Sequence, residues 1–199
     1  MSLPPNELIA VLIAVSFAAG LNVYATVATL GLLGRFHVIA LPQSLHLLTG
    51  WPVILACAVL FGIELFADKV PAFDLIWNAL HTFIRVPVAA LLAWQAAATL
   101  SPVEQLAAAL LGGLIAFLAH GGKTAVRAAV TPSPEPLSNI ALSLSEDVLA
   151  VFLTWLSTWN PYIAAAIALV FIVILIVLIR WVLRAIRSLF LRLQQLLAL

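Results

Sequence analysis

Long apolar stretches alternate along most of the chain with short turns that contain polar residues, glycine or proline. The apolar stretches predict membrane-spanning helices at about residues 7–33, 51–67, 75–100, 103–130, 138–159 and 162–179. A helix of about 17–25 apolar residues crosses the hydrocarbon core of a bilayer. The pattern therefore predicts an all-α polytopic membrane protein with about six transmembrane helices.

The pattern changes near the end of the chain, where arginine enters at helical spacing. Arg180, Arg184 and Arg187 recur at intervals of four and three residues, with apolar side chains between them. A basic amphipathic helix of this kind suits the headgroup layer of a membrane. We therefore divide the chain into a transmembrane region, 1–179, and a tail helix, 180–199, that lies at the membrane surface. The alternative for the tail is a helix that binds a partner protein.

Composition and charge narrow the classes of protein. Of the 199 residues, 65% are hydrophobic and 9% are charged, and the mean hydropathy is +1.20. Soluble domains carry about 25% charged residues, so the bilayer is the expected surroundings. A net charge of +1 leaves no basic face, and we expect no nucleic-acid partner. The single cysteine, Cys57, excludes an internal disulfide and a cysteine-rich metal site. We expect no cofactor.

Basic residues predict the orientation of the helices, because loops in the cytoplasm are enriched in lysine and arginine. Residues 1–7 contain neither, so we expect the first apolar helix to be retained rather than cleaved as a signal peptide. Six spans would place both termini on one side, together with most of the basic residues, whereas Arg35 would lie on the other side. We therefore expect both termini in the cytoplasm.

Two segments share a pattern of residue types at an offset of 61 residues. Each contains a proline, an acid, an asparagine, a hydroxyl and a charge, at Pro71, Asp74, Asn78, Thr82 and Arg85, and at Pro132, Glu135, Asn139, Ser143 and Glu146. The last three of each set share one helix face. We interpret this as a repeated helical hairpin, 51–100 and 103–159, with chance similarity as the alternative. Arg85 and Glu146 would then face each other and neutralise each other, either as a structural pair or in function.

Ionisable side chains lie inside the predicted spans, where a charge costs about 2.5–3.5 kcal/mol on insertion scales and is expected to face the bundle interior. The candidates for binding a cation or a proton are Glu64, Asp68, Glu146 and Asp147. Within this set, Glu64 and Asp68 are the candidate metal ligands, since hard cations prefer carboxylate oxygens. The candidate counter-ions or anion-binding residues are Arg85, His120, Lys123 and Arg127. Together they predict one water-accessible polar site.

Two positions are predicted to break helices. Gly20 with Asn22 interrupts the first apolar stretch, and Gly121 with Gly122 interrupts the fourth. Unwound backbone at membrane depth is tolerated where it lines a cavity, and the helix ends there offer carbonyls to cations or N–H groups to anions. The alternative is that the glycines only permit helices to approach closely.

Several strings, taken together, carry a family resemblance. They are AGLNVY at 19–24, ELFADKVPAFD at 64–74, HGGK at 120–123, SPEP at 133–136 and ED at 146–147. These strings resemble a bacterial membrane family known as domain of unknown function four-one-two-six. The resemblance covers nearly all of the chain before the tail. It implies a multi-pass protein of the bacterial inner (cytoplasmic) membrane, and it implies no established activity.

These observations favour a small transporter, either of a divalent cation or of a proton-coupled solute. Glu64, Asp68 and Lys69 show a weaker likeness to the acidic motif of manganese and calcium exchangers, with one extra residue and without its glycine or hydroxyl. The alternatives are a carrier of lipid or polyprenyl phosphate with a basic headgroup site, and a structural subunit of a membrane complex. No catalytic motif occurs, so we do not expect an enzyme. The expected partners are the bilayer, a small ion or solute, an anionic lipid and a second copy of the chain as a homodimer.

Overall fold

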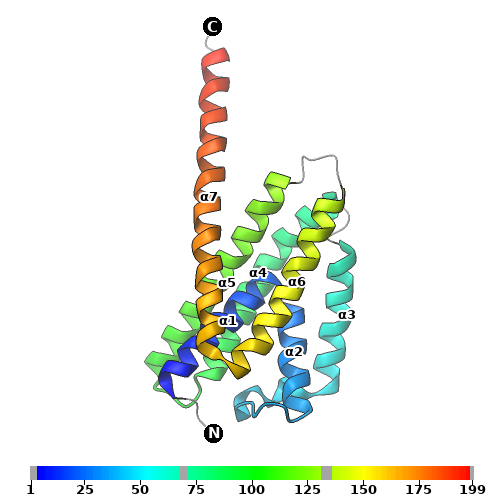
Figure 1. Cartoon of the computed structure of the whole chain (residues 1–199), viewed down its shortest axis with the longest axis vertical. Helices are drawn as coiled ribbons and strands as arrows, with labels where there is room; N and C mark the ends of the chain where they lie inside the picture. The colour runs from blue at the N-terminus through cyan, green and yellow to red at the C-terminus, as the bar shows by residue number, and fades with distance from the viewer. Residues whose placement is uncertain (1–3, 68–70, 131–135, 198–199) are drawn as a thin grey trace.

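The computed structural model describes residues 4–67, 71–130 and 136–197, and its regular elements there are all helical (Figure 1). In chain order these are α1 (Pro5–Leu21), α2 (Val23–Arg35), the 3₁₀ helix η1 (Gln43–Thr49), α3 (Trp51–Ala67), α4 (Pro71–Ala96), α5 (Pro102–Val130), α6 (Pro136–Trp159) and α7 (Pro161–Leu197). Five of these helices begin with proline. Proline is suited to this position because the N–H group that it lacks would have no partner within the helix there.

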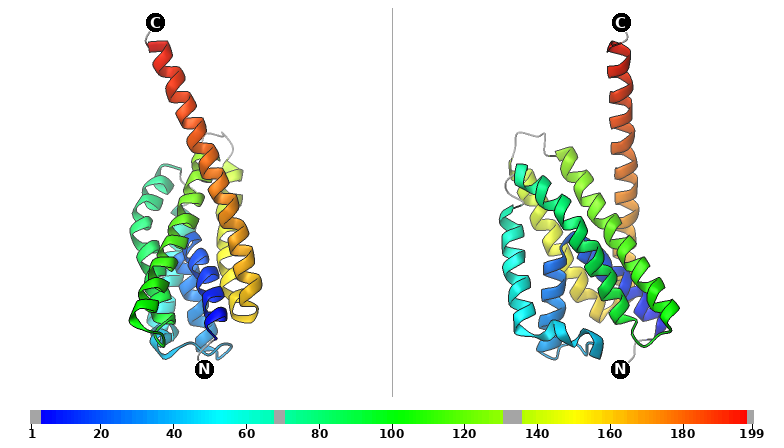
Figure 2. Two further views of the ribbon diagram at one scale, coloured as in Figure 1. Left: turned by 90° about the vertical axis from the view of Figure 1, so that its left-hand side faces the viewer. Right: turned by 180° about the vertical axis from the view of Figure 1, so that it is seen from behind.

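The first apolar stretch forms two helices rather than the single span that we predicted. Asn22 separates α1 from α2 with an extended backbone, at φ −149° and ψ 104°. Its side-chain oxygen accepts a hydrogen bond from the backbone N–H of Ala25 at 2.9 Å, which caps the start of α2. The helix α1 enters the bundle, and α2 returns towards the end from which α1 came (Figures 1 and 2). Together they form a re-entrant hairpin whose tip is Asn22.

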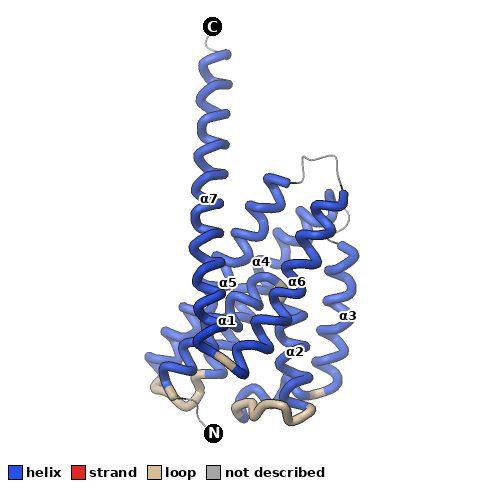
Figure 3. The backbone as a smooth tube through the Cα atoms, viewed as in Figure 1, coloured by secondary structure: helices blue, strands red, loops and turns tan. Residues whose placement is uncertain are grey.

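The remaining long helices cross the molecule in alternating directions around this hairpin. Figure 2 shows α3 to α7 as successive antiparallel elements, and α5 packs against α1, α4 and α7. Figure 3 shows the loops that adjoin α2 and η1 gathered at the end where α1 begins. The hairpin is therefore enclosed by the bundle, and its tip lies among the long helices.

Four of the described helices are long and apolar enough to cross a membrane, namely α4, α5, α6 and α7. A fifth span results if η1 and α3, which meet at an angle of 61°, are counted as one. The protein is thus a multi-pass α-helical membrane protein with four to five candidate spans in its described part. The predicted count of six treated the α1–α2 hairpin as one complete crossing.

The outer surface of the bundle is apolar, as a lipid-facing surface requires. Large side chains such as Phe83 and Val103 are 80% and 77% exposed. Towards the interior, small residues on α1 and α5 let the two helices meet closely. A Cβ atom on Gly20 would lie 2.6 Å from the carbonyl oxygen of Ala116, so these backbones are nearly in contact.

The glycines of α5 do not break it, contrary to our prediction. The helix is continuous through Gly121 and Gly122. A Cβ atom on Gly122 would lie 2.6 Å from Leu175, whereas one on Gly121 would meet nothing within 4 Å. Gly122 therefore permits close packing of α5 on α7. Gly20 likewise lies within α1, and the break falls at Asn22.

The tail also differs from the separate element that we expected. The boundary between 179 and 180 falls inside α7, which continues as one helix to Leu197 and extends past the other helices (Figure 1). Arg180, Arg184 and Arg187 are exposed on this extension. The start of α1 and the end of α7 lie at opposite ends of the molecule (Figure 1), whereas the predicted placement of both termini in the cytoplasm would bring them to one side of the membrane.

Candidate functional site

A network of buried charged side chains surrounds the tip of the hairpin. Four helices contribute to it, and its charged members are Glu64 from α3, Arg85 from α4, Lys123 and Arg127 from α5, and Glu146 and Asp147 from α6. We call these six residues the charge network. All are at most 9% exposed. The network contains three acids and three bases, so its fully ionised form carries no net charge.

Lys123 lies at the centre of the charge network. Its Nζ atom is 3.5 Å from Oε1 of Glu64 and 3.2 Å from Oε2 of Glu146. The same atom donates to the carbonyl oxygen of Leu21 at 3.3 Å. That carbonyl ends α1, so the helix break at Asn22 supplies an acceptor at the tip of the hairpin. One ammonium group therefore links α1, α3 and α6.

Arg85 holds Glu64 from the other side. Its Nη2 atom binds Oε1 of Glu64, and its Nη1 atom lies 2.8 Å from Nδ1 of His120. Arginine only donates, so Nδ1 of His120 accepts and its proton lies on Nε2. The Nε2 atom is 3.0 Å from the carbonyl oxygen of Asn78 and 2.8 Å from Oγ1 of Thr82. His120 is therefore neutral, and it fixes the orientation of Arg85.

Glu146 and Asp147 point to different partners, although they are neighbours in sequence. Glu146 binds Nη2 of Arg127 at 2.8 Å through the same oxygen, Oε2, that contacts Lys123. Asp147 accepts from Nδ2 of Asn22 at 2.8 Å. The Asn22 side chain thus caps α2 with its oxygen and ties the hairpin tip to α6 with its nitrogen.

A second polar branch adjoins the network through α2 and α4. The hydroxyl of Tyr24 lies 2.9 Å from Nε2 of His81, and Nδ1 of His81 lies 2.7 Å from the carbonyl oxygen of Trp77. Tyr24 was not among the predicted site residues. Tyr24 could have been identified from the sequence as a residue with a hydroxyl group two positions after Asn22 in an otherwise apolar stretch.

Two atoms of the charge network are buried without a hydrogen-bond partner among the described residues. They are Oε2 of Glu64 and Nε of Arg85. A buried carboxylate oxygen without a donor is costly unless a proton, water or ligand satisfies it. The site therefore has unused hydrogen-bonding capacity next to its most enclosed ion pair.

The structure brings together most of the predicted site residues, with different pairs. Arg85 binds Glu64, and Glu146 binds Lys123 and Arg127, so the predicted pairing of Arg85 with Glu146 is wrong. Asp68 lies outside the described residues. Within the described ranges no group of three or more His, Cys, Asp and Glu side chains is placed to hold a metal ion. A metal bound by Glu64 and Asp68 stays a prediction.

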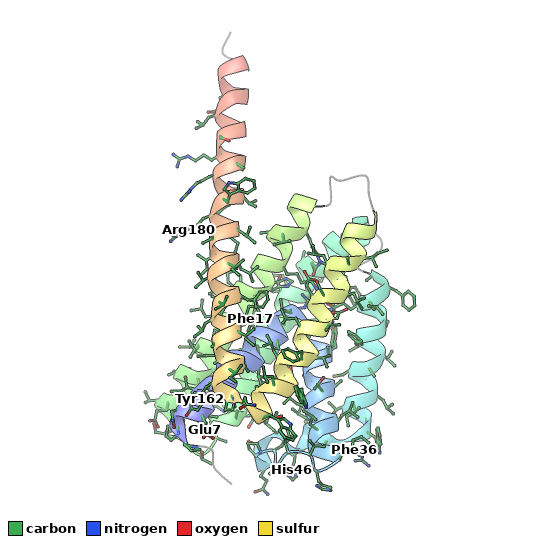
Figure 4. The ribbon with its side chains drawn as sticks, viewed as in Figure 1. Glu7, Phe17, Phe36, His46, Tyr162 and Arg180 are labelled. Atoms are coloured by element: carbon green, nitrogen blue, oxygen red, sulfur yellow. The ribbon has the colours of Figure 1, made fainter. Side chains whose placement is uncertain are left out.

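A large cavity lies towards the end of the molecule where α1 begins. It has a volume of about 1150 Å³ and is lined by residues of α1, the loop before η1 and the turn between α6 and α7. Glu7 and Tyr162 line it, and Figure 4 shows both near that end, with Arg180 farther along α7. Ser16, roughly 9 Å along the helix from the hairpin tip, lines it too. The charge network itself is not part of the lining.

Fold and site together define a multi-pass α-helical membrane protein with a buried network of ion pairs at the tip of a re-entrant hairpin. A family model, described as a domain of unknown function (DUF4126), matches residues 9–181. The chain therefore belongs to the DUF4126 family, as its sequence strings indicated. Comparisons with curated proteins and with solved structures found no match.

Proposed function

We propose that the protein is a small membrane transporter that couples movement of a solute to protons at the charge network. The observation that carries this proposal is Lys123, a fully buried ammonium group shared between two carboxylates from different helices. Protonation of either carboxylate weakens its hold on Lys123. A change of proton occupancy is thereby linked to the packing of α3, α5 and α6.

A purely structural role explains the network poorly. Buried ion pairs contribute little net stability, and apolar side chains of similar volume often do as well or better. Membrane helices associate through close packing of small residues, which α1 and α5 already use at Gly20. Ionisable groups inside a membrane protein therefore point to a substrate or proton pathway.

Between the two kinds of substrate that the sequence favoured, the geometry supports proton coupling over a divalent cation. Both glutamates of the network already have cationic partners from the protein itself. A divalent cation would enter beside three basic side chains. A proton requires only one carboxylate oxygen. The repeated hairpin and the homodimer remain predictions, which this mechanism does not require.

We further propose that the protein lies in the bacterial inner membrane with the end of α7 in the cytoplasm. The exposed arginines on the α7 extension, Arg180, Arg184 and Arg187, support this orientation by the positive-inside tendency. Arg35 is near the opposite end, at the end of α2. The N-terminal end of α1 then faces the periplasm.

The transporter proposal is tested in proteoliposomes that contain a trapped pH indicator. Acetate, inorganic phosphate, manganese, calcium and a neutral amino acid are added outside in turn, and proton movement is recorded. We expect one class of solute to move protons with the wild type and not with Lys123→Met. A matched control is Glu104→Gln. Glu104 is an exposed acid at the start of α5, and glutamine at this position can still accept the capping hydrogen bonds from Ser101. Proton movement equal to that of protein-free liposomes with every solute would refute transport.

A further inference from the structure

The two glutamates that share Lys123 differ in accessibility. The side chain of Glu64 is 1% exposed, and Arg85, which binds it, is fully buried and is held in turn by His120. The side chain of Glu146 is 11% exposed. Glu64, Arg85 and His120 therefore form a fixed frame, and Glu146 is the more exposed of the two carboxylates.

Oε2 of Glu146 occupies a position built for an anion. Nζ of Lys123 lies 3.2 Å from it and Nη2 of Arg127 lies 2.8 Å from it. Two cationic side chains of α5 thus contact the same carboxylate oxygen. If that carboxylate moves away, the same two donors face an empty position suited to an oxygen of a carboxylate or phosphate.

Charge balance requires that such an anion arrive with a proton. The ionised charge network is neutral, and one further negative charge in this enclosed site would be costly. A proton on Glu146 removes its negative charge and weakens its hold on Lys123 and Arg127. When a monovalent anion then binds to these two side chains, the network is neutral again. No bond other than the O–H bond on Glu146 forms.

The groups that face Glu146 are consistent with this exchange. From α5 these are Lys123 and Arg127, and Asp147 is its neighbour on α6. Glu64 on α3 shares Lys123 with Glu146, and Glu64 is in turn bound by Arg85 on α4, which contacts His120. The hairpin contributes Asn22, which is held by Asp147, and Tyr24, which is held by His81. The charged residues of α1, α2 and α7 are confined to Glu7, Arg35 and the arginines from Arg180 onward.

We propose that the solute is a small oxyanion, which replaces the Glu146 carboxylate on Lys123 and Arg127 while Glu146 takes up a proton. This inference rests on the proposed transport function and names its substrate class. The oxyanion is either free, such as a carboxylate or inorganic phosphate, or the phosphate of a lipid headgroup. Glu146 acts as the protein's own competitor for the anion, and its protonation state sets the affinity of the site.

The inference is tested by binding, without transport, on purified protein in a neutral detergent and weak buffer near neutral pH. Acetate, inorganic phosphate and a short-chain phosphatidic acid are titrated in separate experiments. Calorimetry reports binding, and a pH indicator reports proton uptake. With the wild type we expect about one proton taken up per acetate bound. Binding of the phosphatidic acid without binding of inorganic phosphate would identify a lipid as the source of the anion.

Two amide variants separate the roles of the glutamates. Glu146→Gln mimics the protonated side chain, so we expect it to bind the anion about tenfold more tightly and to take up no proton. In Glu64→Gln, Glu146 is still present to accept a proton, so proton uptake on anion binding should persist. Circular dichroism confirms that each variant is folded. Proton uptake by folded Glu146→Gln equal to that of the wild type would overturn the inference.

Failure of this inference is distinguishable from failure of the proposed function. If no anion binds to the wild type or to Glu146→Gln, yet proteoliposomes couple protons to a cation or a neutral solute, the substrate class is wrong and transport stands. If an anion binds with proton uptake and no solute moves protons in proteoliposomes, the site is a binding site and the transporter proposal falls.

Discussion

At the scale of single residues, the charge network depends on Lys123 because its ammonium group contacts both glutamates of the network. It also donates to the carbonyl of Leu21, which is available as an acceptor because α1 ends there. Removal of this single charge leaves three acids against two bases in a buried site.

We therefore predict that Lys123→Met is less stable than the wild type by about 3–5 kcal/mol near neutral pH, the usual effect of removing one partner from a buried ion pair. The loss should shrink as the pH falls, because protonation of a glutamate removes the uncompensated negative charge from the folded variant. Thermal unfolding in detergent at several pH values measures the difference. Glu104→Gln, an exposed acid outside the network, should follow the wild type at each pH. A gap for Lys123→Met that does not change with pH would contradict this electrostatic origin.

At the scale of the helices, much of the fold could be predicted from apolar patterning. The range 51–67 for α3 was predicted to the residue, and α5 and α6 begin and end within two residues of the ranges proposed. Apolar patterning alone does not mark the end of α1, since the residues on both sides of Asn22 are equally apolar, but the break predicted at Gly20 and Asn22 is confirmed at Asn22. The sequence did not show the partner of Asn22, which binds Asp147, 125 positions away in the chain.

The site residues were predictable by type, and their pairings were not. A charged side chain inside an apolar stretch is expected to face the interior, which identified the members of the charge network. Which acid meets which base depends on the rotation and depth of each helix. The repeat paired Arg85 with Glu146 by position, whereas the packing of α3 against α4 places Glu64 closer to Arg85.

The helix scale also supplies a prediction about the glycines. Gly20→Ala should destabilise the protein by about 1–3 kcal/mol, because the added methyl group overlaps the backbone of α5. Gly121→Ala is the matched control, since its methyl group meets open space and alanine is the better helix former by about 1 kcal/mol. Thermal unfolding of the two variants under the same conditions compares them. Equal unfolding temperatures for the two would mean that α1 does not lie against α5 as described.

At the scale of the whole molecule, the re-entrant hairpin decides the topology. The hairpin enters and leaves at one end of the molecule, and α3 to α7 then run in alternating directions, so the start of α1 and the end of α7 lie at opposite ends of the molecule (Figures 1 and 2). The large cavity opens near the start of α1, and the exposed arginines lie at the other end. A solute that enters through the cavity and leaves towards α7 would pass the hairpin tip.

This topology is testable because the chain has one native cysteine. In a Cys57→Ser background, we place a single cysteine at Asn6, near the start of α1, or at Ser188, on the exposed extension of α7. A maleimide that does not cross membranes is added to intact cells, and again after the membrane has been made permeable. We expect Asn6→Cys to react in both conditions and Ser188→Cys only in the second, because α7 carries the arginines that favour the cytoplasmic side. Identical labelling of both positions in intact cells would place them on one side. The α1–α2 segment would then have to cross the membrane after all, and the charge network would no longer lie at the tip of a hairpin.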